Sequence, residues 1–183
     1  MSEVLVPIAN GTEDMEAVII IDVLRRAGVN VVVAGDGDVV TCARGVRIIP
    51  DVALDDLGDD DTFTAIVLPG GSQGVENLIT NRGLEHILRK HQGRKGLLGA
   101  ICAAPRILHE FGLLPKRAVI TSHPSVAHDL ASYAYSLDRV VEDGNIVTSR
   151  GAGTALEFAL TLVRRLVDQT TSMRIAGDIV MYE

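Results

Sequence analysis

Four short segments of the chain carry groups that are typical of nucleophilic catalysis. They contain Glu16, the pair Gly70-Gly71, Cys102 and His123, and each comes after an apolar stretch that predicts a β-strand. In open α/β sheets, ligands bind beyond the carboxyl ends of the parallel strands, which meet at one edge. We therefore expect these segments to converge and to support attack by a thiolate on an electrophilic carbon.

Cys102 is the candidate nucleophile. Residues 97–101 (LLGAI) predict a buried strand and the residues that follow, AAPRIL, predict a helix, so the cysteine lies at a strand-to-helix junction. Nucleophile elbows occupy such junctions, and the helix N-terminus is expected to stabilise the thiolate and lower the pKa of the thiol. The alternative is a buried core cysteine without a chemical role.

Three other groups complement this nucleophile. The backbone N–H groups of Gly71 and Ala103 are candidates for an oxyanion hole, because glycine lets the backbone approach a ligand closely. Glu16 shares a helical stripe with Ile20 and Val23. That position predicts either a buried carboxyl that is neutral or partnered, or a carboxyl in water at the open end of the stripe.

His123 comes directly before Pro124 and after an apolar strand, which places it at a bend of the chain. It is a candidate general base or substrate ligand at the rim of the site. A histidine that caps a turn or lies on the surface fits the same pattern nearly as well.

Strand and helix patterns alternate along the chain, which predicts an α/β fold with a doubly wound, mostly parallel sheet. We expect strands over residues 4–9, 29–34, 65–68, 96–101, 118–121, 139–142 and 145–148, the last two joined as a hairpin at Asp143-Gly144. We expect helices over residues 12–27, 84–91, 102–111 and 155–167, with a short one after residue 170. Residues 39–49 predict a small hairpin, and residues 50–62 an acidic, polar connection.

The composition limits the function. Hydrophobic residues make up 47% of the 183 residues and aromatic residues only 3%, so the core must be aliphatic. A net charge of −7 argues against general nucleic-acid binding. No apolar run reaches the roughly 18 residues that cross a bilayer, and the N-terminus does not resemble a signal peptide. We expect one domain over residues 1–183 in the reducing cytoplasm.

The two cysteines, Cys42 and Cys102, are far apart in the chain and form no CxxC pair. This arrangement favours free thiols over a disulfide scaffold or a zinc site. The sequence therefore predicts neither a metal nor a cofactor.

These motifs together resemble the ThiJ/PfpI superfamily, in particular the branch that contains the parkinsonism-associated protein deglycase and its bacterial relatives. The resemblance spans nearly the whole chain. It is carried by residues 11–16 (GTEDME), 22–28 (DVLRRAG), 67–71 (VLPGG), 94–96 (RKG), 100–103 (AICA), 121–124 (TSHP) and 148–151 (TSRG).

The resemblance implies a flavodoxin-like homodimer and assigns a role to each candidate residue. Cys102 would be the nucleophile, Glu16 its protonated partner, and His123 a neighbour of the site, with the amides of Gly71 and Ala103 as the oxyanion hole. Arg44 would border the site, as would the partner subunit's Arg26. Cys42 would match a second family cysteine near the dimer interface.

For function, the resemblance implies a cysteine-dependent enzyme of the hydrolase or lyase class. Its expected activities are glyoxalase activity without glutathione, and deglycation of proteins and nucleotides that have reacted with methylglyoxal or glyoxal. The alternative is a redox-sensing, chaperone-like stress protein whose Cys102 is oxidised to sulfinate without meaningful turnover.

Overall fold

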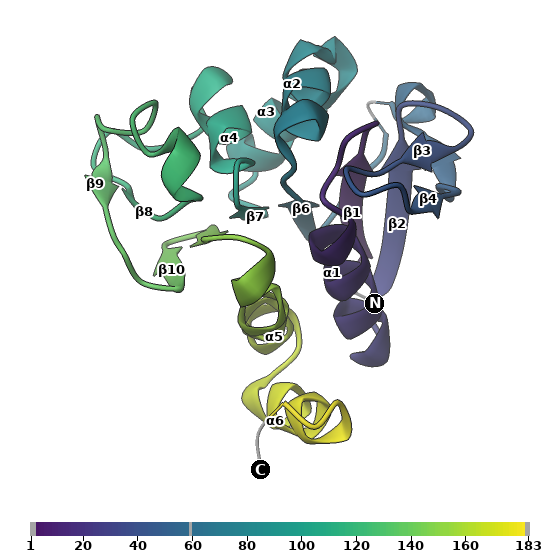
Figure 1. Ribbon diagram of the computed structural model, residues 1–183, viewed down its shortest axis with the longest axis vertical. Helices are drawn as coiled ribbons and strands as arrows, with labels where there is room; N and C mark the ends of the chain where they lie inside the picture. Colours follow the sequence, from purple (N-terminus) through teal and green to yellow (C-terminus); the bar gives the residue numbers. More distant parts are fainter. Residues whose placement is uncertain (1–2, 59, 182–183) are drawn as a thin grey trace.

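The computed structural model describes residues 3–58 and 60–181, and its centre is a seven-stranded sheet (Figure 1). Neighbouring strands are parallel except β10 and β11, which form an antiparallel hairpin. Across the sheet the order is β10 (Val140–Asp143), β11 (Ile146–Ser149), β7 (Leu97–Ile101), β6 (Ala65–Leu68), β1 (Glu3–Ile8), β2 (Asn30–Gly35) and β5 (Val52–Ala53). This arrangement confirms the predicted flavodoxin-like, doubly wound α/β fold.

The strand order reverses between β1 and β6, and this reversal determines where a site can form. The chain runs outward from β1 to β2 and β5, then returns to the other side of β1 as β6 and continues to β7. A crevice therefore opens beyond the carboxyl ends of β1 and β6. The segments that carry Glu16, Gly70-Gly71 and Cys102 all leave the sheet at this end.

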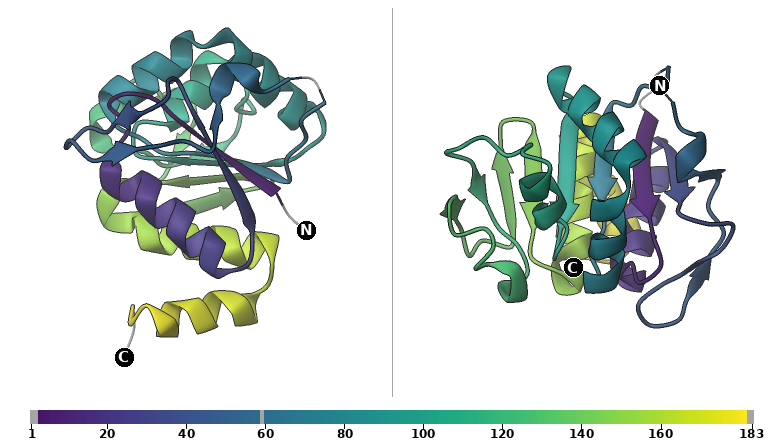
Figure 2. Two further views of the ribbon diagram at one scale, coloured as in Figure 1. Left: turned by 90° about the vertical axis from the view of Figure 1, so that its right-hand side faces the viewer. Right: turned by 90° about the horizontal axis from the view of Figure 1, so that it is seen from above.

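Helices cover both faces of the sheet (Figure 2). One face carries α1 (Asp14–Arg26) and α5 (Ala155–Leu166), with α6 (Gln169–Asp178) packed outside α5. The other face carries α2 (Ser72–Thr80), α3 (Arg82–Gly93) and α4 (Pro105–Glu110). The sheet is therefore buried on both sides, which explains why its inner strands are almost continuously apolar.

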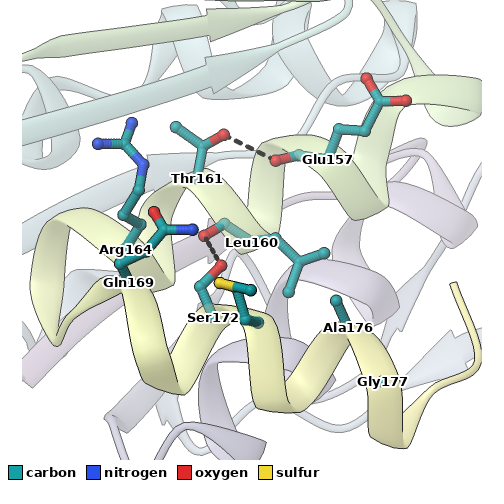
Figure 3. Close-up of a pocket in the computed structure, with 9 residues that line it drawn as sticks. Glu157, Leu160, Thr161, Arg164, Gln169, Ser172, Ala176 and Gly177 are labelled. Atoms are coloured by element: carbon teal, nitrogen blue, oxygen red, sulfur yellow. Dashed lines mark hydrogen bonds between the residues drawn. The ribbon is translucent and has the colours of Figure 1, made fainter. Parts of the chain in front are cut away.

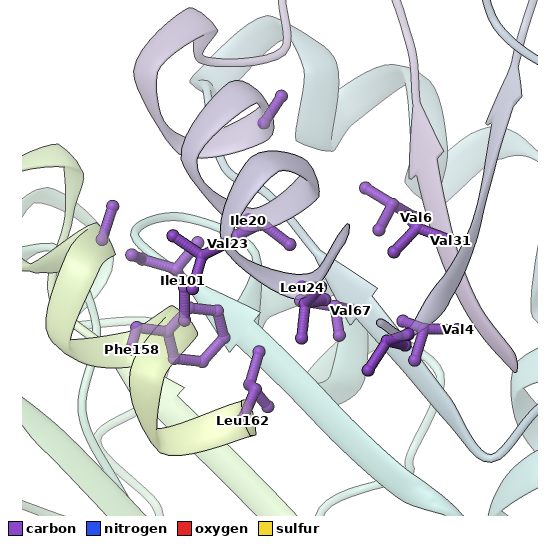
Figure 4. Close-up of a cluster of buried hydrophobic side chains, with 14 of the residues drawn as sticks. Val4, Val6, Ile20, Val23, Leu24, Val31, Val67, Ile101, Phe158 and Leu162 are labelled. Carbon is purple, nitrogen blue, oxygen red and sulfur yellow. The ribbon is translucent and has the colours of Figure 1, made fainter. Parts of the chain in front are cut away.

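The core has two halves because successive side chains of a strand point to opposite faces. In β1, Val4 and Val6 pack with α1 and α5, whereas Leu5 packs with the helices of the other face. Figure 4 shows the first half, in which Ile20 of α1 and Phe158 of α5 lie over the sheet. The core is aliphatic, as the low aromatic content predicted.

Two small sheets lie outside the main one. The antiparallel pair β3 (Val40–Thr41) and β4 (Arg47–Ile48) confirms the predicted hairpin. The parallel pair β8 (Val119–Ile120) and β9 (Ala134–Tyr135) corrects the expectation that residues 118–121 form a strand like those of the main sheet.

The acidic connection over residues 50–62 contains the edge strand β5 and a 3-10 helix over Leu54–Asp56. The helices differ from the expectations in two places. Helix α2 was not expected at all, and the helix predicted from Cys102 begins only at Pro105. Within the described residues, no helix combines the length and apolar character needed to cross a membrane.

Candidate active site

Cys102 lies in a tight turn between β7 and α4, with a left-handed backbone conformation (φ 65°). Two backbone hydrogen bonds hold this turn. The Cys102 N–H donates to the Ser149 carbonyl (3.0 Å), and the Cys102 carbonyl accepts from the His123 N–H (2.8 Å). A residue other than glycine with a positive φ is strained unless its surroundings fix it, and here they do, as expected for a nucleophile elbow.

Glu16 lies in the first turn of α1 and is completely buried, which decides between its two predicted environments. Its Oε2 accepts a hydrogen bond of 2.7 Å from the Gly70 N–H. Among the described residues its Oε1 has no hydrogen-bond partner, although the Cys102 thiol lies beside the carboxyl. Because burial disfavours the charged form, the pKa of Glu16 rises to about 7.

Burial and the charge of the neighbouring Glu16 raise the pKa of the Cys102 thiol to about 12, while the N–H groups of Gly71 and Ala103, which donate to the sulfur, act in the opposite direction. With Glu16 ionised, the pKa of the thiol is therefore raised and not lowered as predicted, because the sulfur is largely removed from water and α4 begins three residues later. Two groups in such contact titrate as one unit. Between the two pKa values, Glu16 and Cys102 together hold one proton.

Three glycine residues let the loops around Glu16 and Cys102 pack closely enough for the site to form. A Cβ atom on Gly70 would lie 2.6 Å from Cys102 Cβ and 2.7 Å from Glu16 Oε2, so only glycine lets the pair meet here. Gly71 has a φ of 92°, and a Cβ there would collide with the Gly11 carbonyl oxygen. At Gly74 a Cβ would lie 2.6 Å from the backbone nitrogen of Thr12. The start of α2 is thus packed directly against the loop after β1, which fixes the Gly71 amide.

The sulfur faces a cavity of about 520 Å³. The cavity is lined by Gly11, Glu13, Thr41, Cys42, Ala43, Arg44, Gly71, Ser72, Gln73, Cys102, Ala103, His123 and Ser125. It therefore brings together Cys102, Gly71, Ala103, His123 and Arg44 from the predicted set, with Glu16 buried behind the sulfur.

His123 caps a turn and also lines the cavity, while its role as general base or substrate ligand stays a prediction. Its Nδ1 accepts from the Ser125 N–H (3.2 Å) and lies 2.8 Å from Ser125 Oγ, so it caps the short 3-10 helix Pro124–Val126. Because an N–H can only donate, Nδ1 of the neutral ring is the acceptor and Nε2 carries the proton. The ring also lines the cavity, where it has an N–H available for a ligand.

Asp14 holds the hairpin that carries Arg44. Its two carboxylate oxygens accept hydrogen bonds from the N–H groups of Arg44 (2.7 Å) and Val46 (2.9 Å). Although burial raises the pKa of Asp14, these two donors outweigh it and keep the pKa below its ordinary value. The loop that contributes Arg44 to the cavity is therefore anchored to the start of α1, two residues before Glu16.

Arg26 lies apart from the cavity of its own chain. It is in the last turn of α1, at the end of the helix opposite to Glu16, and pairs with Asp22 (2.6 Å). The prediction that it reaches the partner's site concerns a second subunit and stays a prediction.

Sequence reasoning did not assign Cys42, Ser72, Gln73 and Ser125 to the cavity. Ser72 and Gln73 come directly after Gly70-Gly71, so their place in the sequence was a usable signal. The sequence around Cys42 gave no such signal, because Cys42 reaches the cavity only when the hairpin of β3 and β4 folds over the loop after β1. Cys42 is only 4% exposed, and burial raises the pKa of its thiol to about 11.

A second cavity, of about 550 Å³, lies between α5 and α6 (Figure 3). Its hydroxyl groups already have acceptors, since Thr161 donates to the Glu157 carbonyl within α5 and Ser172 of α6 donates to the Leu160 carbonyl of α5. No cysteine or histidine is among its lining residues. We therefore place the candidate site in the cavity beside Cys102. Within the part of the chain that the structure describes, no cluster of side chains is suited to hold a metal ion.

Comparisons with known proteins agree with this geometry. Residues 2–165 match the DJ-1/PfpI family. The chain is 40% identical over 182 residues to the Parkinson disease protein 7 homolog of Danio rerio, which covers 97% of this chain and 96% of that protein. It is 40% identical over 157 residues to the glutathione-independent glyoxalase DJR-1.2 of Caenorhabditis elegans, covering 84% of this chain and 82% of that protein. The crystal structure of Drosophila melanogaster DJ-1beta has a TM-score of 0.94 and 41% identity, with 98% of each chain covered.

Proposed function

Because the chain belongs to the DJ-1/PfpI family, we propose that it is a cysteine-dependent glyoxalase that needs no glutathione. Its substrates would be methylglyoxal and glyoxal, and its products lactate and glycolate. The observation that carries the proposal is the contact between the buried Glu16 and the partly buried Cys102, whose sulfur accepts hydrogen bonds from two backbone N–H groups and faces a cavity. The relative from Caenorhabditis elegans, which is named for this activity, supports it.

The reaction begins with the shared proton of the pair. The sulfur has two N–H donors and the carboxyl of Glu16 has one, so we place the negative charge on sulfur and the proton on Glu16. The thiolate adds to the aldehyde carbon of methylglyoxal. The electron pair of the carbonyl bond moves to its oxygen, where the Gly71 and Ala103 amides stabilise the charge.

The remaining steps are proton transfers and one hydrolysis. Protonation of the oxygen gives a hemithioacetal. Its carbon-bound proton then moves by way of an enediol to the neighbouring carbon, leaving a lactoyl thioester on Cys102. Glu16 and His123 would exchange these protons, since both lie beside the reacting atoms. Attack by water on the thioester releases lactate and restores the thiol, so that one water is consumed for each methylglyoxal.

The same site would accept the early adducts that dicarbonyls form with amines or thiols of proteins and nucleotides. A volume of about 520 Å³ is much larger than methylglyoxal needs, and Arg44 at the rim offers a positive charge to the rest of a larger substrate. Deglycation is therefore a second use of the same nucleophile. We also propose that the protein works as a homodimer in the cytoplasm, where the thiols stay reduced.

The test is methylglyoxal turnover without glutathione, measured as lactate formed. Cys102→Ala should abolish turnover because it removes the nucleophile, and Cys42→Ala should leave most of it because Cys42 lies in the cavity wall with a thiol that stays protonated. Circular dichroism checks that both variants fold. Equal losses in the two folded variants would contradict the assignment.

A redox-sensing, chaperone-like role is the second candidate, and one observation favours it. The Gly71 and Ala103 N–H groups, which donate hydrogen bonds to the sulfur, would equally donate to the oxygens of a sulfinate. Peroxide would oxidise the thiolate in two steps, each transferring one oxygen atom to sulfur and releasing one water.

We expect limited peroxide to add two oxygen atoms to Cys102 before it modifies Cys42, because only Cys102 shares its proton with a second acid. Peptide mass spectrometry over a peroxide series measures the order. Earlier oxidation of Cys42 would count against a special reactivity of Cys102.

A further inference from the structure

Arg106 joins the three segments that carry the site. It lies on α4, four residues after Cys102, and its guanidinium forms two ion pairs. Its NH1 donates a hydrogen bond to Glu76 Oε1 (2.5 Å), whereas its Nε lies 3.0 Å from Asp129 Oδ2 as an ion pair without hydrogen-bond geometry. Glu76 is on α2, which begins directly after Gly71, and Asp129 follows the short helix that starts after His123.

The environment of Arg106 distinguishes it from an ordinary surface arginine. Its side chain is 21% exposed, compared with 53% for Arg89, which pairs with Glu85 on α3. Asp129 is 30% exposed, so its pair with Arg106 is partly shielded from water and salt, whereas Glu76 is 54% exposed and its pair is screened more strongly. The hydrogen bond to Glu76 has a fixed direction, as is usual for a planar guanidinium, whereas the contact with Asp129 depends on charge alone. Arg106 can therefore hold two carboxylates close to α4, Glu76 by a directed hydrogen bond and Asp129 by an ion pair.

We propose that Arg106 is a positioning residue that holds α2 and the segment after His123 against α4, and thereby sets the Gly71 N–H and the His123 ring relative to the Cys102 sulfur. It is not among the residues that line the cavity, so it acts through these segments and not on a substrate. The part of the proposal that concerns turnover rests on the proposed function. The part that concerns the sulfur does not.

The two ion pairs of Arg106, called here its Glu76 arm and its Asp129 arm, should have separable effects. Glu76 lies on α2, and the residue directly before α2 is Gly71, whose amide stabilises the thiolate before any substrate binds. Asp129 lies on the segment that follows His123, which acts only once a substrate is present. Loss of the Glu76 arm should therefore change the reactivity of Cys102 itself, whereas loss of the Asp129 arm should change turnover alone.

The experiment compares Arg106→Met with Arg89→Met, a matched loss of an ion pair away from the site. The readouts are the alkylation rate of Cys102 by iodoacetamide at pH 7, followed by peptide mass spectrometry, and kcat and KM for methylglyoxal. Small displacements of catalytic groups are costly, so Arg106→Met should slow alkylation and lower kcat about tenfold, with KM changed less than about twofold. Arg106→Lys should recover part of both, and Arg89→Met should match the wild type.

Single-arm variants keep the test informative if Arg106→Met does not fold. Glu76→Gln should slow alkylation, and Asp129→Asn should lower kcat while alkylation stays at the wild-type rate. If Arg106→Met or both single-arm variants lower the melting temperature but leave alkylation and kcat unchanged, Arg106 is only a structural residue and the proposal fails. If the wild type turns over no methylglyoxal, the proposed function fails, while the alkylation rates still test the Glu76 arm.

Discussion

At the scale of single residues, the site depends on one proton held between Glu16 and Cys102. Burial raises the pKa of Glu16 to about 7, and burial with the Glu16 charge raises that of Cys102 to about 12. Near neutral pH the pair therefore carries one negative charge, which resides either on sulfur or on the carboxylate. The donors around the sulfur favour the thiolate, and a titration distinguishes the two cases.

We expect the thiolate absorbance of the wild type to appear with a midpoint well below pH 12, because the first proton that the pair loses leaves the charge on sulfur. Glu16→Leu removes the donor and should move the midpoint upward. Glu16→Gln keeps a donor and should move it less. A wild-type midpoint near 12 that falls in Glu16→Leu would mean that Glu16 is ionised and that the protonated role is wrong.

The sequence predicted which residues meet but not how deeply they are buried. Cys102, Gly71 and His123 were placed together because each follows a strand, a rule that needs only topology. The burial of Glu16 depends on the Gly70 loop, which comes from 54 positions further along the chain and closes over the helix start. A helical stripe shows the direction of a side chain and not what covers it, so the pKa values of the pair could not be predicted.

At the scale of elements, helix α2 matters most to the site because its first turn carries the Gly71 amide. Its sequence, SQGVENLIT, includes Gly74, a poor helix former, so propensity did not predict it. The glycine is required for another reason, namely the close approach of the loop after β1. Local propensity and tertiary packing conflict here, and packing determines the outcome.

Gly74→Ala should therefore destabilise the protein, although alanine favours helices. The added methyl group would press on the Thr12 backbone, and overpacking of this kind costs about 1–3 kcal/mol in the free energy of unfolding. Displacement of the Gly71 amide should also slow alkylation of Cys102. Gly177→Ala is the control, because its Cβ would meet nothing within 4 Å and should slightly stabilise α6. Denaturant unfolding measures both, and equal stability of the two variants would refute the packing argument.

The strands of the main sheet were easier to predict than the short pairings. Strands β1, β6 and β7 are buried on both faces, so their apolar runs identify them directly. Strand β5 has two residues that pair with the end of β2, and β8 pairs with β9 over two residues. Such short pairings follow from where the neighbouring strand happens to lie, which no local pattern encodes.

At the scale of the whole molecule, an apolar area is exposed on α1 and the hairpin of β3 and β4. Met15 is 55% exposed and Val18 47% on α1, while Val46 is 48% and Ile49 78% exposed on or beside the hairpin. Val18 and Ile49 line one shallow hollow. The same hairpin carries Arg44, so a subunit docked here would lie close to the cavity.

We expect a homodimer by light scattering at micromolar concentration, with this apolar area at its interface. Ile49→Glu should give monomers, because it places a charge in a buried apolar contact. Leu137→Glu, at a residue that is 75% exposed on another part of the surface, should leave the dimer intact. A wild-type monomer with full activity would remove the partner subunit's Arg26 from the site.

The left-handed backbone of Cys102, with φ at 65°, has a consequence for how this sequence evolves. A residue with a Cβ atom in that conformation costs roughly 1–2 kcal/mol relative to glycine. Cysteine codons are one base change from glycine codons, and at this position the change would relieve backbone strain while removing the thiol. Glycine is therefore within reach of one mutation, and selection for stability alone would favour it. A lineage that retains cysteine here is under selection for the sulfur itself, whichever reaction the sulfur performs.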